Sequence, residues 1–458
     1  MADSTFPAAE LDAATGLLQQ LLRIDTTNPP GNERAAAEHL AGVFRKEGLE
    51  PELNGSCPDR PNLTVRWNAK PENRSARPLV LSTHLDVVPA DESKWAHPPF
   101  SGHNDGTCIW GRGAIDMKGF AVMAVAALTR LKRENLPINR DIIFAAVADE
   151  EAGTRHGSQW LVDERPDLLG DDPEYVINEV GGFTVHQKGK RFYPIQVAEK
   201  GVAWIRLTVE GSPGHSSLPA NDSSVQKLAS AINAITAARL PWHAGEEAKA
   251  FLAGFAAPEN AIAKKVAPLL AHPKIGPRLL SLAVSDPSRR ASLEAILRNT
   301  ATPTRLRSGD AINVLPGSAS VDIDGRLAPG QDAGDLIREL ETVLRPVTGN
   351  AAKFEVLQES PAVSFSKETP LFRQMEKGLL EADPGSHIVP SIIPGFTDSR
   401  NYAKLGATCY GFYPLQLPED LDFAAMFHGH DERIPVAGFH WGINVLTDTL
   451  RRFLVSGR

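Results

Sequence analysis

Apolar positions recur in two different patterns along this 458-residue chain. In the first 200 residues, segments with an apolar residue every three or four positions alternate with short runs that are apolar throughout. The first pattern is typical of helices that pack on a sheet, and the second of parallel strands buried on both faces. Together they predict a doubly wound α/β layer, with helices at about 10–24, 33–47 and 119–134 and strands at 62–67, 78–88, 141–151 and 174–182.

The pattern of apolar positions changes near residue 200. There "GVAWIRLTVEG" alternates apolar and polar positions, as a half-exposed antiparallel strand does. A helix at 223–240, a strand pair within 312–327, a helix at 332–344 and a strand at 353–359 follow. Two strand-helix-strand halves predict a ferredoxin-like α+β unit. We expect a first catalytic part at 1–199, an inserted lid or dimerisation domain at 200–360 with a helical insertion at about 241–303, and a second catalytic part at 361–458.

Charge and cysteine content narrow the function classes. The 48 basic and 56 acidic residues give a net charge of -8 without long blocks of like charge, which disfavours nucleic acid or an anionic membrane as partner. We expect no secretory signal and no membrane span. Cys57, Cys108 and Cys409 lie far apart, so neither a disulfide framework nor a thiolate zinc site is indicated. The expectation is a cytoplasmic protein.

Histidine and carboxylate side chains gather where the predicted strands end. Ligands of open α/β sheets bind outside the carboxyl ends of the strands, so these residues should share one edge. Such a concentration of negative charge requires cations, and histidine with carboxylate but no cysteine suits zinc, or cobalt or manganese. Two ions that share a carboxylate would use about five protein ligands. The candidates are His84, Asp86, Asp116, Glu150, Glu151 and Glu179, with His428 or His430 from a later loop.

These segments resemble the dizinc metallopeptidases and amidohydrolases that include aminoacylase, acetylornithine deacetylase, succinyl-diaminopimelate desuccinylase, glutamate carboxypeptidase and carboxypeptidase S. The resemblance covers nearly the whole chain and implies an α/β, mixed-sheet zinc-peptidase-like catalytic domain with an inserted ferredoxin-like lid. The insertion at 241–303 is longer than the compact lids of the deacetylase and desuccinylase branches. The matching segments are "STHLDVVPA", "WGRGAIDMKG", "ADEEAG", "NEVGG", "GSPGHSSLP", "NVLPGSASVDIDGR", "GFTDSR" and "HGHDE".

The resemblance also implies a role for each residue. One ion would be held by His84 and Glu179 and the other by Glu151 and His428, the histidine that fits His-x-x-Asp-Glu, with Asp116 as the bridge. Glu150 would remain unligated and activate a water held between the ions. Asp86 would hydrogen-bond the free nitrogen of His84. The resemblance implies in addition a cis peptide between Asp116 and Met117.

The lid would complete the site. His215 resembles the histidine that donates to the developing oxyanion, and in dimeric relatives it comes from the neighbouring subunit. Asn313 and Arg326 resemble positions that bind the polar end of the substrate. For Arg326 a surface ion pair with Asp322 or Asp324 stays open. Gly395 and Thr397 would contact the substrate backbone or only form a turn.

The resemblance implies a hydrolase of N-acyl amino acids or dipeptide-like substrates with a free carboxylate, possible as a homodimer through the lid. The alternatives are a binding or regulatory protein that keeps the fold without turnover, and an aminopeptidase of related architecture. "GRGAID" lacks most of a dinucleotide-binding fingerprint. "GSPGHSSLP" lacks the strand-to-helix elbow of a serine hydrolase.

Overall fold

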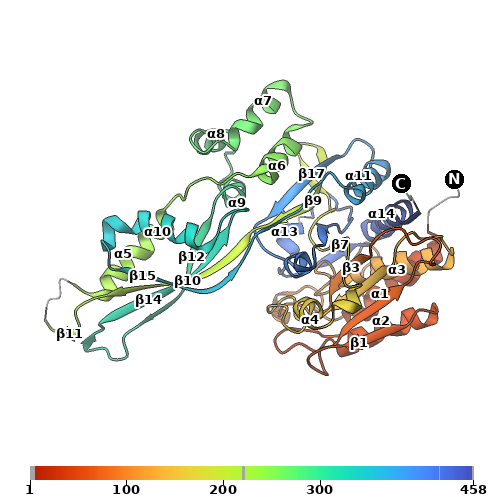
Figure 1. The fold of residues 1–458 in the computed structure, drawn as a ribbon, viewed down its shortest axis with the longest axis horizontal. Helices are drawn as coiled ribbons and strands as arrows, with labels where there is room; N and C mark the ends of the chain where they lie inside the picture. The colour runs from red at the N-terminus through yellow and green to blue at the C-terminus, as the bar shows by residue number, and fades with distance from the viewer. Residues whose placement is uncertain (1–5, 219–221, 422, 456–458) are drawn as a thin grey trace. The chain divides into compact units, whose positions relative to one another are not determined.

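The computed structural model describes residues 6–218, 222–421 and 423–455, which divide into two compact units (Figure 1). Unit 1 takes the described residues up to Val197, Phe365–Pro390 and the residues from Thr397 onward. Unit 2 takes Ala198–Ser364 and Ser391–Phe396. The middle of the chain therefore forms a unit of its own, and unit 1 is assembled from the two flanking parts.

Unit 1 is built on most of a mixed sheet in the order β1-β2-β6-β3-β7-β18-β9-β16, with β8 and β17 also paired to β9. The strand β16 and the last residues of β9 and β17 belong to unit 2. The central strands β6, β3, β7 and β18 run parallel, whereas β2 and β9 join them antiparallel. All six residues of β3 and of β6 are buried, as expected of strands covered on both faces. The strands are β1 (Pro51–Asn54), β2 (Asn62–Trp67), β3 (Leu79–His84), β6 (Ile142–Val147), β7 (Tyr175–Asn178), β8 (Val185–Gln187), β9 (Lys190–Glu199), β16 (Val363–Ser364), β17 (His387–Ile393) and β18 (Thr408–Gly411).

Two apolar cores lie on the two faces of this sheet. Leu79 and Leu81 of β3 belong to the larger core with α1, α3, α11 and α14, whereas Val80 belongs to the smaller core with α4. Successive residues of a strand point to opposite faces, so one apolar run supplies both cores. The helices are α1 (Ala8–Leu22), α2 (Arg34–Lys46), α3 (Lys118–Arg133), α4 (Ser158–Glu164), α11 (Pro370–Ala382), α12 (Ser399–Tyr402), α13 (Phe423–Met426) and α14 (Val436–Val455).

Short elements complete unit 1. A three-stranded sheet has the order β19-β5-β4, in which β19 (Arg433–Pro435) pairs antiparallel with β5 (Cys108–Trp110). This pairing joins a segment near the C-terminus to the segment before α3. The remaining elements are β4 (His103–Asn104) and the 3₁₀ turns η1 (Glu92–Lys94), η2 (Pro166–Leu169) and η3 (Ala403–Leu405).

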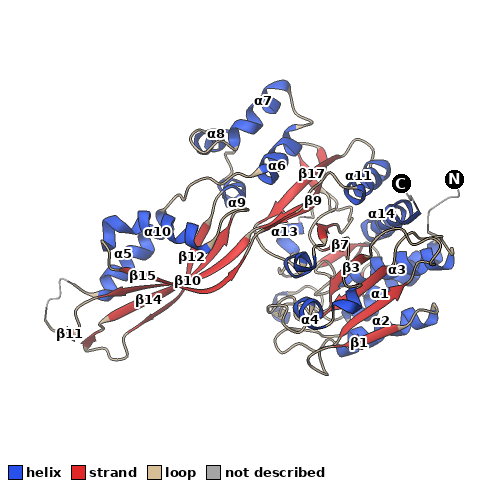
Figure 2. Ribbon diagram, viewed as in Figure 1, coloured by secondary structure: helices blue, strands red, loops and turns tan. Residues whose placement is uncertain are grey.

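Unit 2 contains a four-stranded antiparallel sheet in the order β12-β14-β10-β15 (Figure 2). Ile205 and Val321 of the sheet share a core with Leu228 of α5 and Leu340 of α10. The bounds are β10 (Gly201–Glu210), β11 (Gly214–His215), α5 (Ser224–Ala237), α6 (Glu246–Ala256), α7 (Ala261–Leu270), α8 (Gly276–Ala283), α9 (Pro287–Leu297), β12 (Thr300–Ser308), β13 (Val314–Leu315), β14 (Ser318–Leu327), α10 (Ala333–Thr348) and β15 (Ala352–Ser360).

The predicted elements are present, and several further elements were not predicted, among them β9 and β12. The strand β12 was not predicted, because Pro303 interrupts its pattern and its last five residues are exposed. Proline is tolerated at sheet edges, and the β12 register with β14 shifts between Pro303 and Arg305. The helices of the expected insertion are α6 to α9.

Candidate metal centre

The carboxyl ends of the parallel strands bring the candidate ligands together. His84 is the last residue of β3, and Glu179 directly follows β7. The Nε2 atom of His84 lies 2.9 Å from Asp116 Oδ1 and 3.6 Å from Glu179 Oε2. Ligand atoms of His84, Glu150 and Glu179 all lie within 4.8 Å of one another, and so do those of His84, Asp116 and Glu151. The predicted shared edge is therefore present.

Asp116 occupies the middle of this cluster. Its Oδ1 faces His84, whereas its Oδ2 lies 2.9 Å from Nε2 of His428. The same His428 nitrogen is 3.2 Å from Glu151 Oε2. The Asp116 carboxylate thus lies between two pairs of residues, His84 with Glu179 and His428 with Glu151. The Asp116–Met117 peptide is cis, as the resemblance implied.

Burial and mutual repulsion raise the pKa of most of these carboxyls. Burial, with the charge of Glu179, raises the pKa of Glu150 well above its usual range. Burial raises the pKa of Glu151 to about 7 and that of Glu179 to about 8. Burial opposes ionisation of Asp116 too, but hydrogen bonds from His428 and His84 hold its pKa below the usual range.

Divalent cations fit this donor set. The Oε1 atom of Glu151 is buried without a hydrogen-bond partner among the described residues, and it lies in a group of histidine and carboxylate donors. An unsatisfied buried carboxylate oxygen costs free energy that a cation would remove. Hydrogen bonds to Asp116 and Glu151 also raise the pKa of His428 to about 10, which shows how strongly the cluster attracts positive charge.

Asp149, the first of the three carboxylates that follow β6, has a separate role. Asp149 lies 3.0 Å from Nη1 of Arg60 and accepts a hydrogen bond from the Asn28 side chain at 3.1 Å. Arg60 also makes a buried ion pair with Glu33 at 2.7 Å. The positive charge of Arg60 therefore compensates the negative charge of Asp149. Glu150 and Glu151 remain to face the cluster.

The predicted contact of Asp86 with His84 is wrong in one respect. Nδ1 of His84 lies 2.9 Å from the backbone oxygen of Asp86, whereas the Asp86 carboxylate is 3.6 Å away. That carboxylate instead accepts hydrogen bonds from the backbone N–H groups of Glu150 and Glu151, both at 3.1 Å. The backbone of Asp86 orients the imidazole, and its side chain holds the turn that presents the two glutamates.

The "GFTDSR" segment is divided between the two units. Gly395 belongs to unit 2, and Thr397 belongs to unit 1. The Thr397 side chain is 1% exposed, accepts a hydrogen bond from Asn178 at 3.0 Å and lies 3.0 Å from Ser399 Oγ. Its hydroxyl therefore supports the loop, and a substrate contact would come from its backbone. The neighbouring Asp398 is buried, and its charge contributes to the raised pKa of Glu150.

Three further predicted residues lie in unit 2. His215 is exposed on β11, and its Nδ1 accepts a hydrogen bond from the Ser217 N–H at 3.2 Å. Asn313 is exposed before β13. Arg326 makes a two-point ion pair with Asp324 at 2.9 and 3.0 Å, so the surface pairing left open by the sequence is present.

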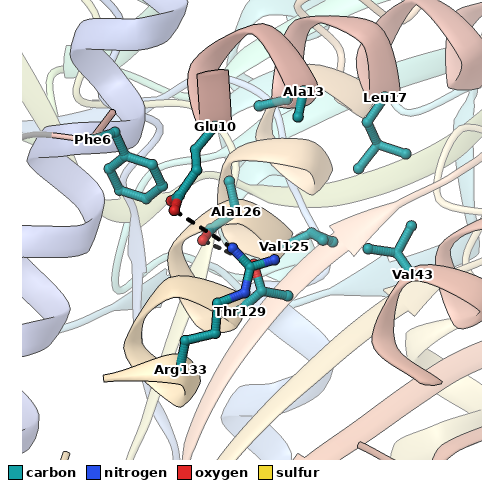
Figure 3. Close-up of a pocket in the computed structure, with 10 residues that line it drawn as sticks. Phe6, Glu10, Ala13, Leu17, Val43, Val125, Ala126, Thr129 and Arg133 are labelled. Atoms are coloured by element: carbon teal, nitrogen blue, oxygen red, sulfur yellow. Dashed lines mark hydrogen bonds and ion pairs between the residues drawn. The ribbon is translucent and has the colours of Figure 1, made fainter. Parts of the chain in front are cut away.

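A separate cavity in unit 1 lies among helices α1, α2 and α3 (Figure 3). Its volume is about 200 Å³ and its wall is mainly apolar. The charged pair Glu10 and Arg133 lies at its edge, 3.7 Å apart. No histidine lines it, and it has none of the metal-ligating residues. The candidate ligands therefore lie outside this cavity, at the strand ends.

This combination of fold and site agrees with the known proteins that the chain is similar to. The model of peptidase family M20/M25/M40 matches residues 80–452. The chain belongs to this family. It is 27% identical to aminoacylase-1 of Sus scrofa over 95% of this chain and 93% of that protein. It is 29% identical to the N-fatty-acyl-amino acid synthase/hydrolase PM20D1 of Mus musculus, over 80% and 72% respectively.

A solved structure of an M20 family metallo-carboxypeptidase from Sulfolobus solfataricus has the same fold. The TM-score is 0.69 at 18% identity, with 98% of this chain and 100% of that chain covered. Membership of this peptidase family makes the chain a metal-dependent hydrolase. Another solved structure of this fold, from Bacillus subtilis, is described as a dinuclear metal-binding peptidase of the M20 family. None of the described helices has the length and apolar character needed to cross a membrane.

Sequence reasoning missed the residues that support the cluster. Arg60 and Glu33 carry no motif, because their pairing joins positions 27 residues apart. Arg112 and Glu432 were visible in "WGRGAID" and "HGHDE", but without a role. Only the folded chain shows which strand ends and loops these side chains connect.

Proposed function

We propose that this chain hydrolyses the amide bond of an N-acyl amino acid, or of a dipeptide-like substrate with a free carboxylate, with two bound divalent ions. The observation that carries the proposal is the placement of Asp116, with one carboxylate oxygen toward His84 and the other toward His428. A carboxylate shared in this way is the usual bridge of a two-metal site. The names of the relatives, aminoacylase-1 among them, support the substrate class.

The ligands divide into two sets around the bridge. His84 and Glu179 would hold one ion, and Glu151 and His428 the other. Nitrogen and oxygen donors without thiolate favour Zn²⁺, with Co²⁺ or Mn²⁺ as alternatives. When bound, the ions would polarise the scissile carbonyl and lower the pKa of the attacking water.

Glu150 is the proposed general base. Its carboxylate lies in the cluster, and its raised pKa suits a group that takes a proton from water and returns it to the leaving amine. The same proximity would also allow Glu150 to act as a ligand. The metal content of a Glu150→Gln variant distinguishes the two roles.

His215 is the proposed donor to the oxyanion of the tetrahedral intermediate. Because the Ser217 N–H donates to Nδ1, the neutral ring carries its proton on Nε2. That N–H is then free of the Ser217 contact and can donate to a substrate oxygen.

Unit 2 is the proposed lid. Its strand order, with α5 and α10 packed in the sheet's core, supports a ferredoxin-like arrangement. Arg326 would leave Asp324 to bind the substrate carboxylate, and Asn313, Gly395 and Thr397 would contact the polar substrate backbone. We also propose the domain limits 1–199, 200–360 and 361–458, a cytoplasmic location, and a homodimer formed through the lid.

The test is hydrolysis by the purified full chain after dialysis against chelator and reloading with Zn²⁺, Co²⁺ or Mn²⁺. The panel contains N-acyl amino acids, dipeptides and the same compounds as carboxyl amides. We expect metal-dependent release of free amino acid only from substrates with a free carboxylate. Equal cleavage of the amides would indicate an aminopeptidase. Uptake of two ions with no hydrolysis of any compound would contradict the proposal in favour of a binding protein.

A further inference from the structure

Glu432 lies beneath the cluster and accepts an unusual number of hydrogen bonds for one carboxylate. Its side chain is fully buried. Oε1 accepts the backbone N–H groups of Ile115 at 2.7 Å and Asp116 at 3.0 Å. Oε2 accepts the N–H of Gly113 at 3.0 Å and Nη1 of Arg112 at 2.8 Å. The loop that carries the bridging carboxylate is therefore wrapped around one glutamate.

Arg112 extends this arrangement to a second loop. Its Nη2 donates to the backbone oxygen of Gly429 at 2.8 Å, next to His428. The guanidinium is 2% exposed and lies 5.2 Å from the centre of the Trp95 ring. Glu432, which comes from the loop of His428, thus holds the loop of Asp116. Arg112, which comes from the loop of Asp116, in turn holds the loop of His428.

The loop of His428 needs such support, because its backbone is not in a relaxed conformation. His428 and Asp431 have φ values of 57° each, in the left-handed region that non-glycine residues rarely adopt. Such positions persist only where surrounding contacts hold them. In the loop of Asp116, Gly113 has a φ of 90°, which glycine adopts without strain, and a Cβ there would lie 2.9 Å from Val87, so the loop packs closely against its neighbours.

We propose that the Arg112–Glu432 pair is a positioning device for metal binding, which fixes Asp116 and His428 relative to each other before an ion arrives. This inference rests on the proposed two-metal function. Because the pair holds the loop of His428 and, among the described residues, makes no hydrogen bond with His84 or Glu179, its effect should fall on one ion in particular. That ion is the one held by Asp116, Glu151 and His428.

The experiment measures Co²⁺ binding to the full chain by isothermal titration calorimetry and visible absorption, for wild type and Glu432→Gln. The glutamine amide has the shape of the glutamate side chain, but its NH₂ group would face N–H donors that require an acceptor. The substitution also leaves the Arg112 guanidinium without its negatively charged partner. We expect affinity for one ion to fall roughly 10- to 100-fold while the other is retained, as is usual when a group that orients a ligand is removed.

A matched control separates positioning from general stability. Asp383 is another buried carboxylate of unit 1, with Arg191 at 2.8 and 2.6 Å and the Tyr193 hydroxyl at 2.8 Å, and it belongs to neither loop. Asp383→Asn should lower the melting temperature to a similar degree and leave both Co²⁺ affinities unchanged. Equal loss of metal affinity in both variants would overturn the proposal, because the effect would then be one of stability.

A second variant covers the case in which Glu432→Gln does not fold. Arg112→Lys keeps the charge but has a single nitrogen, which cannot reach Glu432 and the Gly429 oxygen in the same geometry. We expect the same selective weakening of one ion. Two ions bound by either folded variant with wild-type constants would refute the positioning role and leave the proposed function intact. A wild type that binds no Co²⁺ would instead refute the proposed function.

Discussion

Replacement of Lys200 by methionine should change how the stability of unit 2 depends on pH. Lys200 is 1% exposed, and its ammonium donates to the backbone oxygens of Ala295 at 2.8 Å and Arg298 at 2.7 Å, at the end of α9. Burial, together with the charges of Arg326 and Arg298, lowers its pKa from 10.5 to about 7, and Glu339 acts in the opposite direction. The folded state therefore disfavours the charged form.

The sign and size of the effect follow from this pKa difference. Between pH 7 and 10.5 the unfolded chain holds a proton on Lys200 that the folded chain has released, so the free energy of unfolding rises with pH in this window. With these two pKa values, the rise from pH 6 to pH 9 is about 2 to 3 kcal/mol. Methionine keeps the apolar stem without the amine, so the Lys200→Met variant should lack this rise.

The assay is equilibrium urea unfolding of the full chain at pH 6 and pH 9, read by pulsed hydrogen exchange of peptides from β10 and β14. The quantity of interest is the difference between wild type and Lys200→Met at each pH, since other titrating groups cancel. Lys353→Met, at a lysine whose side chain is 64% exposed, is the control for loss of a positive charge. A wild-type-minus-variant difference that stays the same at both pH values would refute the reasoning.

Three further predictions concern the centre. Glu150→Gln should keep both ions and lose nearly all turnover, because proton transfer is removed and ligation is not; loss of one ion on metal analysis would make Glu150 a ligand. His215→Ala should lower kcat roughly 10²- to 10³-fold with metal content intact, and unchanged steady-state kinetics would exclude it as oxyanion donor. Apparent Zn²⁺ affinity should rise from pH 6 to pH 8. Neighbouring carboxylates raise the pKa of His84, and they raise that of His428 to about 10, so the metal must displace protons from both histidines. Competition titrations with a chelator measure this affinity, and an affinity that does not change with pH would contradict the prediction.

The alternation of buried strands and helices, and the edge at which His84, Glu150 and Glu179 meet, could be predicted from the sequence. Each of these residues follows or ends an apolar run, and parallel strands place such ends together. His428 lies in an irregular loop, so its place in the cluster could be predicted only from resemblance. The strand β12 was missed because exposure and Pro303 remove the pattern that marks a strand.

Partnerships between distant polar groups were beyond sequence reasoning. The pairing of Arg60 with Asp149 and the contacts of the Asp86 carboxylate depend on how loops close, which periodicity does not record. For Arg326, the sequence offered both a substrate and a surface role, and the pair with Asp324 forms because the two residues lie on the same side of β14. Local spacing thus identified the candidates, and tertiary structure selected their partners.

The position of Arg60 determines which carboxylates are left to attract cations. Arg60 pairs with both Asp149 and Glu33, so the Asp149 carboxylate already has a positive charge beside it. The negative charge available to a metal ion is therefore concentrated on Asp116, Glu150, Glu151 and Glu179, whose ligand atoms lie together. Loss of Arg60 would add a further uncompensated carboxylate next to the centre and should favour binding of excess cation.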